Sequence, residues 1–356
     1  MKRLAMLLLL SFFLCTPCFG ADVWDIKKAL PEEAREVLTE IDPDQPDAKA
    51  GFSALWKWCC NHVREKLKIA FHAAFQITAV CILLSLLKSF AESAGVSLPS
   101  RIPDLAGATA ILLLALDDGG TLVEHCRQTV NQLDLFTKTL TTVFAVASAT
   151  AGKPVTAVAS AGATLLFSDL LLSLTQHLFL PAVTWYLLLQ YMGTISENNA
   201  LRQAAVTGKW GITTFFKLFL TAYFVYLTFT GLVSGSADAA AIKTAQSLSS
   251  AVPFVGSVIS SASGTFLAGA NLLRAGVGLF GFLGALAICL SPLLAGVCHF
   301  LVFRLLSIFA SSFAEGGTKV MLDAISSAYS MLLGILISCC AIQFIAIVVS
   351  MTVGSI

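Results

Sequence analysis

The sequence predicts an all-α, polytopic membrane protein with about six or seven transmembrane spans and amphipathic interfacial helices. Apolar residues make up 57% of its 356 residues and charged residues only 12%, about half the charged share of a typical soluble protein. Long apolar runs follow residue 68, and such runs must contact lipid or one another. The 22 basic and 21 acidic residues nearly cancel. The chain therefore has no basic excess with which to bind nucleic acid.

Residues 1–20 have the layout of a secretory signal peptide. A basic start at Lys2 and Arg3 precedes a short apolar run, and small residues follow it. We expect cleavage between Gly20 and Ala21. The alternative is a first transmembrane helix, but the apolar run is too short to cross a hydrocarbon core of about 30 Å. With cleavage, residues 21–68 begin on the outer side of the membrane.

Residues 21–68 form an extracytoplasmic segment that we expect to be helical. Pro31 precedes acidic residues, an order favoured at helix starts. Apolar residues then recur at steps of three and four between Phe52 and Leu67, with basic residues between them. This pattern predicts an amphipathic helix. The helix either lies on the membrane surface or continues directly into the first span, and both readings remain open.

Two transmembrane groups follow, in residues 69–233 and 276–356. The apolar runs that predict them are Ile69–Leu87, Ile102–Leu116, Leu140–Ala151, Val155–Phe167, Leu170–Met192, Gly211–Val233, Val277–Phe303 and Tyr329–Val353. The long runs can each span a membrane alone. The short runs are tilted spans, re-entrant hairpins or packed helices. A break at Gly152-Lys153-Pro154 separates two of them.

A segment rich in Ser, Ala and Gly, residues 234–275, separates the two groups. It carries an intermittent apolar face, so we expect an amphipathic helix at the membrane surface or against other helices, with a flexible linker as the alternative. Directly after it, glycines recur at Gly276, Gly278, Gly281 and Gly284. Glycines this dense predict close packing between helices or subunits, because a facing backbone can approach where no side chain stands.

Charged residues within predicted spans are the candidates for a functional site. They are Asp169, Lys217 and Arg304. Each either belongs to a polar path through the membrane or extends its charge toward an interface. The sequence contains no metal-ligand spacing, nucleophile motif, phosphate-binding loop or dinucleotide motif. We therefore expect no enzymatic activity, no metal and no cofactor.

Four segments and their glycine and proline placement resemble the stage III sporulation protein AE family. The segments are Leu180-Pro181-Ala182-Val183, Val252-Pro253-Phe254-Val255-Gly256, Leu272-Leu273-Arg274-Ala275-Gly276-Val277-Gly278 and Ile288-Cys289-Leu290-Ser291-Pro292-Leu293-Leu294. The resemblance extends from about residue 50 onward, and the signal peptide fits it as well.

The resemblance implies a non-enzymatic component of a channel that sustains the developing endospore. Proteins of this family lie in the mother-cell membrane around the forespore. Their partners are other membrane proteins of the stage III sporulation operon and, through them, stage II sporulation protein Q, so oligomeric assembly is expected. The alternative is a stand-alone secondary transporter with a substrate site at broken helices, such as those around Pro181 and Pro292.

Overall fold

The chain is all-helical throughout the residues that the computed structural model describes, which are 30–38, 47–94, 101–150, 154–229, 276–310 and 316–355. This confirms the predicted fold class. The helices are α3 (Glu32–Val37), α4 (Ala48–Ser93), α5 (Arg101–Thr150), α6 (Pro154–Leu174), the π-helical turn η1 (Thr175–Phe179), α7 (Leu180–Ile195), α8 (Asn199–Phe229), α11 (Gly276–Ala310) and α12 (Gly316–Ser355). The predicted signal peptide, with Gly20 and Ala21, and the predicted amphipathic segment 234–275 lie outside the described residues.

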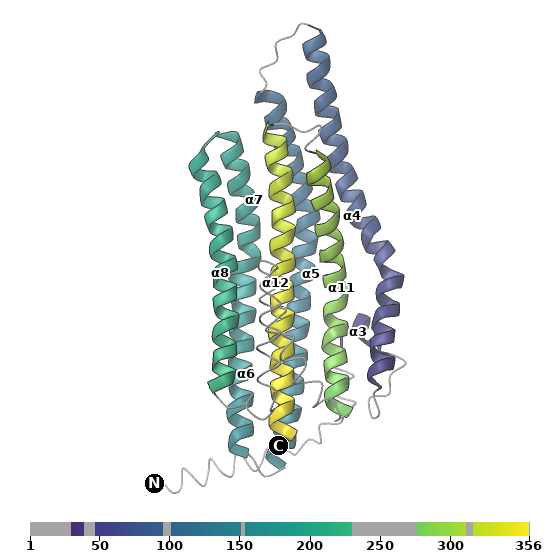
Figure 1. The fold of residues 1–356 in the computed structure, drawn as a ribbon, viewed down its shortest axis with the longest axis vertical. Helices are drawn as coiled ribbons and strands as arrows, with labels where there is room; N and C mark the ends of the chain where they lie inside the picture. Colours follow the sequence, from purple (N-terminus) through teal and green to yellow (C-terminus); the bar gives the residue numbers. More distant parts are fainter. Residues whose placement is uncertain are drawn as a thin grey trace, which may run out of the picture.

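The long helices form an elongated bundle in which α6 and α7 continue in one direction and the other successive long helices run in opposite directions (Figure 1). Helix α12 lies at its centre and packs against α5, α6, α7, α8 and α11. Five helical segments of the described residues are long and apolar enough to cross a membrane: Ala48–Ala91, Ile102–Phe144, Thr164–Ile195, Gly278–Ala310 and Gly316–Val348. The protein is therefore a multi-pass membrane protein, and the predicted six or seven spans slightly exceed this number.

Helix α5 explains part of the excess. Its 50 residues include Ile102–Leu116 and all but the last residue of the run Leu140–Ala151, which the sequence suggested as separate short elements. The polar stretch between them contains no proline, so the helical hydrogen bonds continue through it. A helix of this length extends about 75 Å, more than twice the hydrocarbon thickness. The polar middle of α5 is therefore part of the bundle and not a loop.

The runs Val155–Phe167 and Leu170–Met192 likewise join into one continuous path, α6–η1–α7. Helix α5 ends at Thr150 and α6 begins at Pro154, and Gly152 and Lys153 of the predicted break lie outside the described residues. Pro181 is accommodated by the π-helical turn that precedes it, in which the N–H of Leu180 bonds to the carbonyl oxygen of Thr175. A proline inside an α-helix removes one hydrogen bond and clashes with the carbonyl group four residues before it, and a π-helical turn is one of the interruptions at which such a helix departs from the regular pattern.

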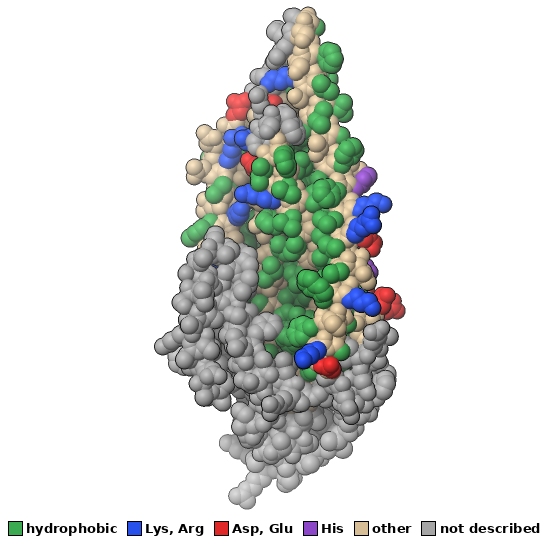
Figure 2. Space-filling model, turned by 45° about the vertical axis from the view of Figure 1, so that its right-hand side comes forward, with side chains coloured by type: hydrophobic (Ala, Val, Ile, Leu, Met, Phe, Trp, Pro, Cys, Tyr) green, Lys and Arg blue, Asp and Glu red, His purple; other side chains and the backbone are tan. Residues whose placement is uncertain are grey.

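Helix α4 contains both the amphipathic stretch before residue 68 and the apolar run after it. The segment therefore continues directly into the span, as one of the two open readings proposed. Helix α4 lies along the side of the bundle, against α11 and α5. Much of its apolar surface is exposed, including Phe71, Phe75 and Phe90. Figure 2 shows apolar side chains covering this face of the molecule, with charged side chains along its edge.

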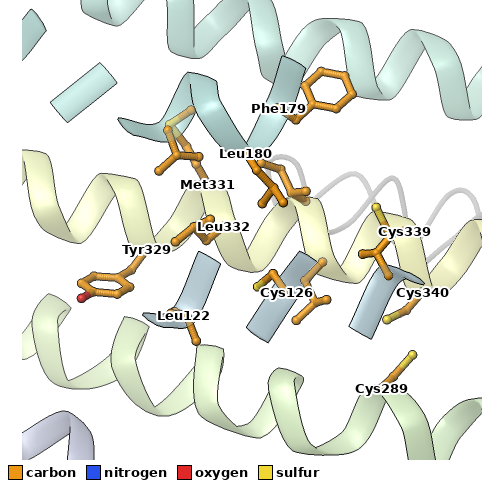
Figure 3. Packing of buried hydrophobic residues seen from close by; sticks show 14 of the residues in the cluster. Leu122, Cys126, Phe179, Leu180, Cys289, Tyr329, Met331, Leu332, Cys339 and Cys340 are labelled. Atoms are coloured by element: carbon orange, nitrogen blue, oxygen red, sulfur yellow. The ribbon is translucent and has the colours of Figure 1, made fainter. Parts of the chain in front are cut away.

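The apolar core forms where α12 meets its neighbours (Figure 3). Leu332 and Met331 of α12 lie near Leu122 of α5 and Leu180 of α7. Several thiols are buried in the same core, and each behaves there as a small apolar group. They are Cys126, Cys289, Cys298, Cys339 and Cys340. Packing around α12 therefore fixes the relative positions of α5, α7 and α11.

Candidate functional site

An ion-paired cluster with one buried and one exposed carboxylate connects α5 to α6. Asp134 of α5 is only 4% exposed, and its Oδ2 lies 2.7 Å from Nζ of Lys138, one helical turn further along. The same Nζ also donates a short hydrogen bond to Asp169 of α6. Two carboxylates and one ammonium leave the cluster with one net negative charge. Paired charges between helices of a multi-pass bundle are a candidate for function.

Neutral polar groups extend the cluster from α6 to α12. Ser168 Oγ donates a hydrogen bond of 2.6 Å to Asp134 Oδ1, and Gln343 Nε2 of α12 donates one of 2.7 Å to Ser168 Oγ. Two buried oxygens near this chain of contacts, Thr137 Oγ1 and Gln343 Oε1, have no hydrogen-bond partner among the described residues. Buried polar groups are expensive to leave unpaired. The network of Asp134, Lys138, Ser168, Asp169 and Gln343 is hereafter called the polar network.

Helical spacing explains how the polar network forms. Asp134 and Lys138 stand four residues apart, so both side chains lie on one face of α5. Ser168 and Asp169 are adjacent and point in different directions around α6. Ser168 is therefore buried and bonds to Asp134, whereas Asp169 is exposed and reaches Lys138 from the outer side.

A second polar cluster lies one third of the way along α5. Tyr329 of α12 donates a short hydrogen bond to Asp118 Oδ2, and Nε2 of His299 lies 3.6 Å from the same oxygen. Nδ1 of His299 is 2.8 Å from the carbonyl oxygen of Ala295 and must donate to it. Nε2 therefore carries a proton toward Asp118 only when the imidazole is doubly protonated. This cluster connects α5, α11 and α12.

Of the three charged residues that the sequence singled out, only one belongs to the polar network. Asp169 joins the polar network, whereas Lys217 and Arg304 are exposed and lie on α8 and α11. Arg304 comes near Lys209 of α8, and partial burial together with this second cation lowers the pKa of Lys209. The sequence reasoning missed Asp134 and Lys138, because they lie in the polar stretch of α5. Their four-residue spacing was the available signal.

The glycine run lies at a tight contact between helices of the same chain. Gly278, Gly281 and Gly284 are buried in α11, and Gly276 begins this helix. A Cβ at Gly281 would stand 2.9 Å from a methyl carbon of Leu140, and one at Gly284 would stand 2.7 Å from Phe136. Both neighbours belong to α5. Side chains at these glycines would therefore displace either the side chains of Leu140 and Phe136 or helix α11 itself.

The chemistry available here is electrostatic and structural. No group of three His, Cys, Asp or Glu side chains in the described helices is arranged to hold a metal ion. The polar network can hold charge within the bundle and fix the register of α5, α6 and α12.

Comparison with known proteins identifies one family. The model of the family described as stage III sporulation protein AE matches residues 35–354, nearly the whole chain. No curated protein and no solved structure matches it.

Proposed function

The chain belongs to the stage III sporulation protein AE family, and we propose on that ground that it is a non-enzymatic membrane component of a channel between the mother cell and the forespore. It is a sporulation-associated, multi-pass membrane protein. In this proposal it lies in the mother-cell membrane around the forespore. Its partners there are the other membrane proteins of the stage III operon and, through them, stage II sporulation protein Q.

The family match carries this proposal. The helical bundle is compatible with it, because a long, rigid bundle suits a scaffold onto which other membrane proteins assemble. Helices of about 50–75 Å extend beyond a hydrocarbon core of about 30 Å and offer surface outside the bilayer for such contacts.

A matched pair of strains tests the proposal. Deletion of the gene should arrest forespore development after engulfment, and the full-length chain expressed from a mother-cell promoter should restore spore yield. The same chain expressed only in the forespore should not restore it. The tagged protein should co-purify with products of the stage III operon. Rescue from the forespore, or purification without any of these partners, would contradict the proposal.

The alternative, a secondary transporter that acts alone, is favoured by one observation. A charged cluster with buried unpaired oxygens lies beside a path that contains a π-helical turn and Pro181, and such interruptions recur at transporter sites. Reconstitution separates the two functions. The purified chain in sealed liposomes should catalyse no uptake of ions or solutes if the channel proposal is right, and uptake would favour the transporter.

A further inference from the structure

A large groove opens on the side of the bundle between α4, α5 and α11. Its volume is about 1130 Å³. Its walls include Glu65, Lys68 and Phe75 of α4, Asp117 and Asp118 of α5, and Phe309 of α11. The face that carries α4 and α11 shows a wide apolar surface bordered by charged side chains (Figure 2). The groove is separate from the polar network.

The charged side chains gather at one end of the groove, whereas the other end is lined by phenylalanines together with the uncharged Gln76 and Thr78. Helix α4 runs parallel to α11 and antiparallel to α5 (Figure 1). Glu65 and Lys68 of α4 therefore lie at the same end as Asp117 of α5, whereas Phe75 and Phe309 lie toward the other end. A ligand that fits this groove has a polar end and a long apolar end.

The height of the polar end matches the position of lipid headgroups. The uncharged run Ile69–Leu87 of α4 extends about 28 Å, close to the hydrocarbon thickness of about 30 Å. If this run spans the bilayer, Glu65 and Lys68 stand where the headgroups begin. The apolar walls then lie beside the acyl chains, and Phe71 and Phe75 are exposed there.

The charges at the polar end select among headgroups. Three carboxylates, those of Glu65, Asp117 and Asp118, and one ammonium group, that of Lys68, line this end of the groove. Asp118 already accepts a hydrogen bond from Tyr329. The phosphate of a lipid can pair with Lys68, and the remaining acids repel further negative charge but attract a cation. A headgroup with both a phosphate and an ammonium complements this arrangement.

We propose that the groove between α4, α5 and α11 binds a zwitterionic aminophospholipid of the phosphatidylethanolamine type. Its phosphate pairs with Lys68, its ammonium with Asp117 and Glu65, and its acyl chains lie against Phe71, Phe75, Leu305 and Phe309. An acyl chain adapts to irregular apolar walls more readily than a rigid helix does. Bound lipid would fill the space between α4 and α11.

Native mass spectrometry of the full-length protein in mild detergent tests the proposal. The protein is titrated with equal amounts of phosphatidylethanolamine and phosphatidylglycerol that carry the same acyl chains. The wild-type protein should retain the amine lipid severalfold more than the glycerol lipid. Asp117→Asn should remove most of this preference. Glu124→Gln is the matched control, because Glu124 is an exposed acid of the same helix outside the groove, and it should leave the preference unchanged.

Equal retention of both lipids by the wild-type protein would overturn the proposal, as would an unchanged preference in Asp117→Asn. A photo-crosslinking residue at Phe75 in native membranes distinguishes the remaining occupants. Cross-linking to lipid supports the proposal. Cross-linking mainly to another protein would mean that a partner helix covers the groove, and would overturn it. Both outcomes are independent of whether spore development needs the protein.

Discussion

Helix α12 is enclosed by the bundle, whereas α4 lies along its outer side. Of the most apolar 18-residue stretch of α12, 89% is buried, against 28% of the corresponding stretch of α4. Both helices are long and apolar enough to cross a membrane. Because lipid tails are as apolar as a protein core, apolarity alone does not decide which helix is enclosed.

The two helices differ in the small and polar side chains that they carry. Ser326, Ser338 and Gln343 of α12 are buried, and Gln343 bonds to another helix. Helix α4 instead presents phenylalanines to its surroundings. In a membrane, small and hydrogen-bonding residues favour helix contacts, and large apolar residues serve equally well against lipid. The following predictions test this contrast, from the largest expected effect to the smallest.

The polar network should be the most sensitive part of the enclosed side. Lys138→Met leaves the carboxylate of Asp134 buried without its cation, which should lower the free energy of unfolding by about 3–5 kcal/mol. The measurement is reversible unfolding of the purified protein in mixed detergent. Arg127→Met is the control, because Arg127 pairs with Glu124 on the exposed face of the same helix, and it should change stability by less than about 1 kcal/mol. Equal effects would show that Asp134 is not enclosed in the membrane-embedded protein.

A leucine pair compares the two helices directly. Leu336 of α12 is 1% exposed and Leu83 of α4 is 66% exposed. Leu336→Ala creates a cavity and should destabilise the protein by about 2–5 kcal/mol. Leu83→Ala should change stability by no more than about 0.5 kcal/mol, as is usual for surface positions. Thermal unfolding of both variants in the same detergent measures the difference. A large loss at Leu83 would mean that a partner or tightly bound lipid encloses α4 as well.

A substitution in the glycine run should have an effect of intermediate size on the stability of the protein. Gly281→Leu meets Leu140 of α5 and should destabilise the protein by about 1–3 kcal/mol through overpacking, with a lower spore yield. Gly208→Leu on α8 is the control, because a Cβ there meets no atom within 4 Å. Membrane abundance, unfolding temperature and co-purification with partners are compared. If Gly281→Leu keeps its unfolding temperature but loses its partners, the run packs against another subunit instead of α5.

A single hydrogen bond between helices should have the smallest effect. Thr109 of α5 bonds to Tyr191 of α7 at 2.9 Å and also to a carbonyl oxygen of its own helix. Thr109→Val should lower stability by about 0.6 kcal/mol, the average for such bonds in membranes. Thr139→Val serves as the reference, since Thr139 donates to the carbonyl oxygen of Leu135 in its own helix. Indistinguishable unfolding of the two variants would assign no stabilisation to the Thr109–Tyr191 contact.

The sequence by itself determined the helical class, the membrane setting, the break before Pro154 and the family. These properties follow from composition, from apolar run length and from local proline and glycine placement, which act over a few residues. The charged residue Asp169 was also visible, because a charge within an apolar run stands out against its neighbours.

Only the tertiary structure decided that α5 is one helix through its polar middle, that α12 is enclosed, and that Ser168 bonds to both Asp134 and Gln343. These two contacts join residues that are 34 and 175 positions apart along the chain. Helical periodicity shows which side chains share a face of one helix. Which face meets which other helix depends on packing across the whole bundle, and in a uniformly apolar environment no short stretch of sequence encodes that choice.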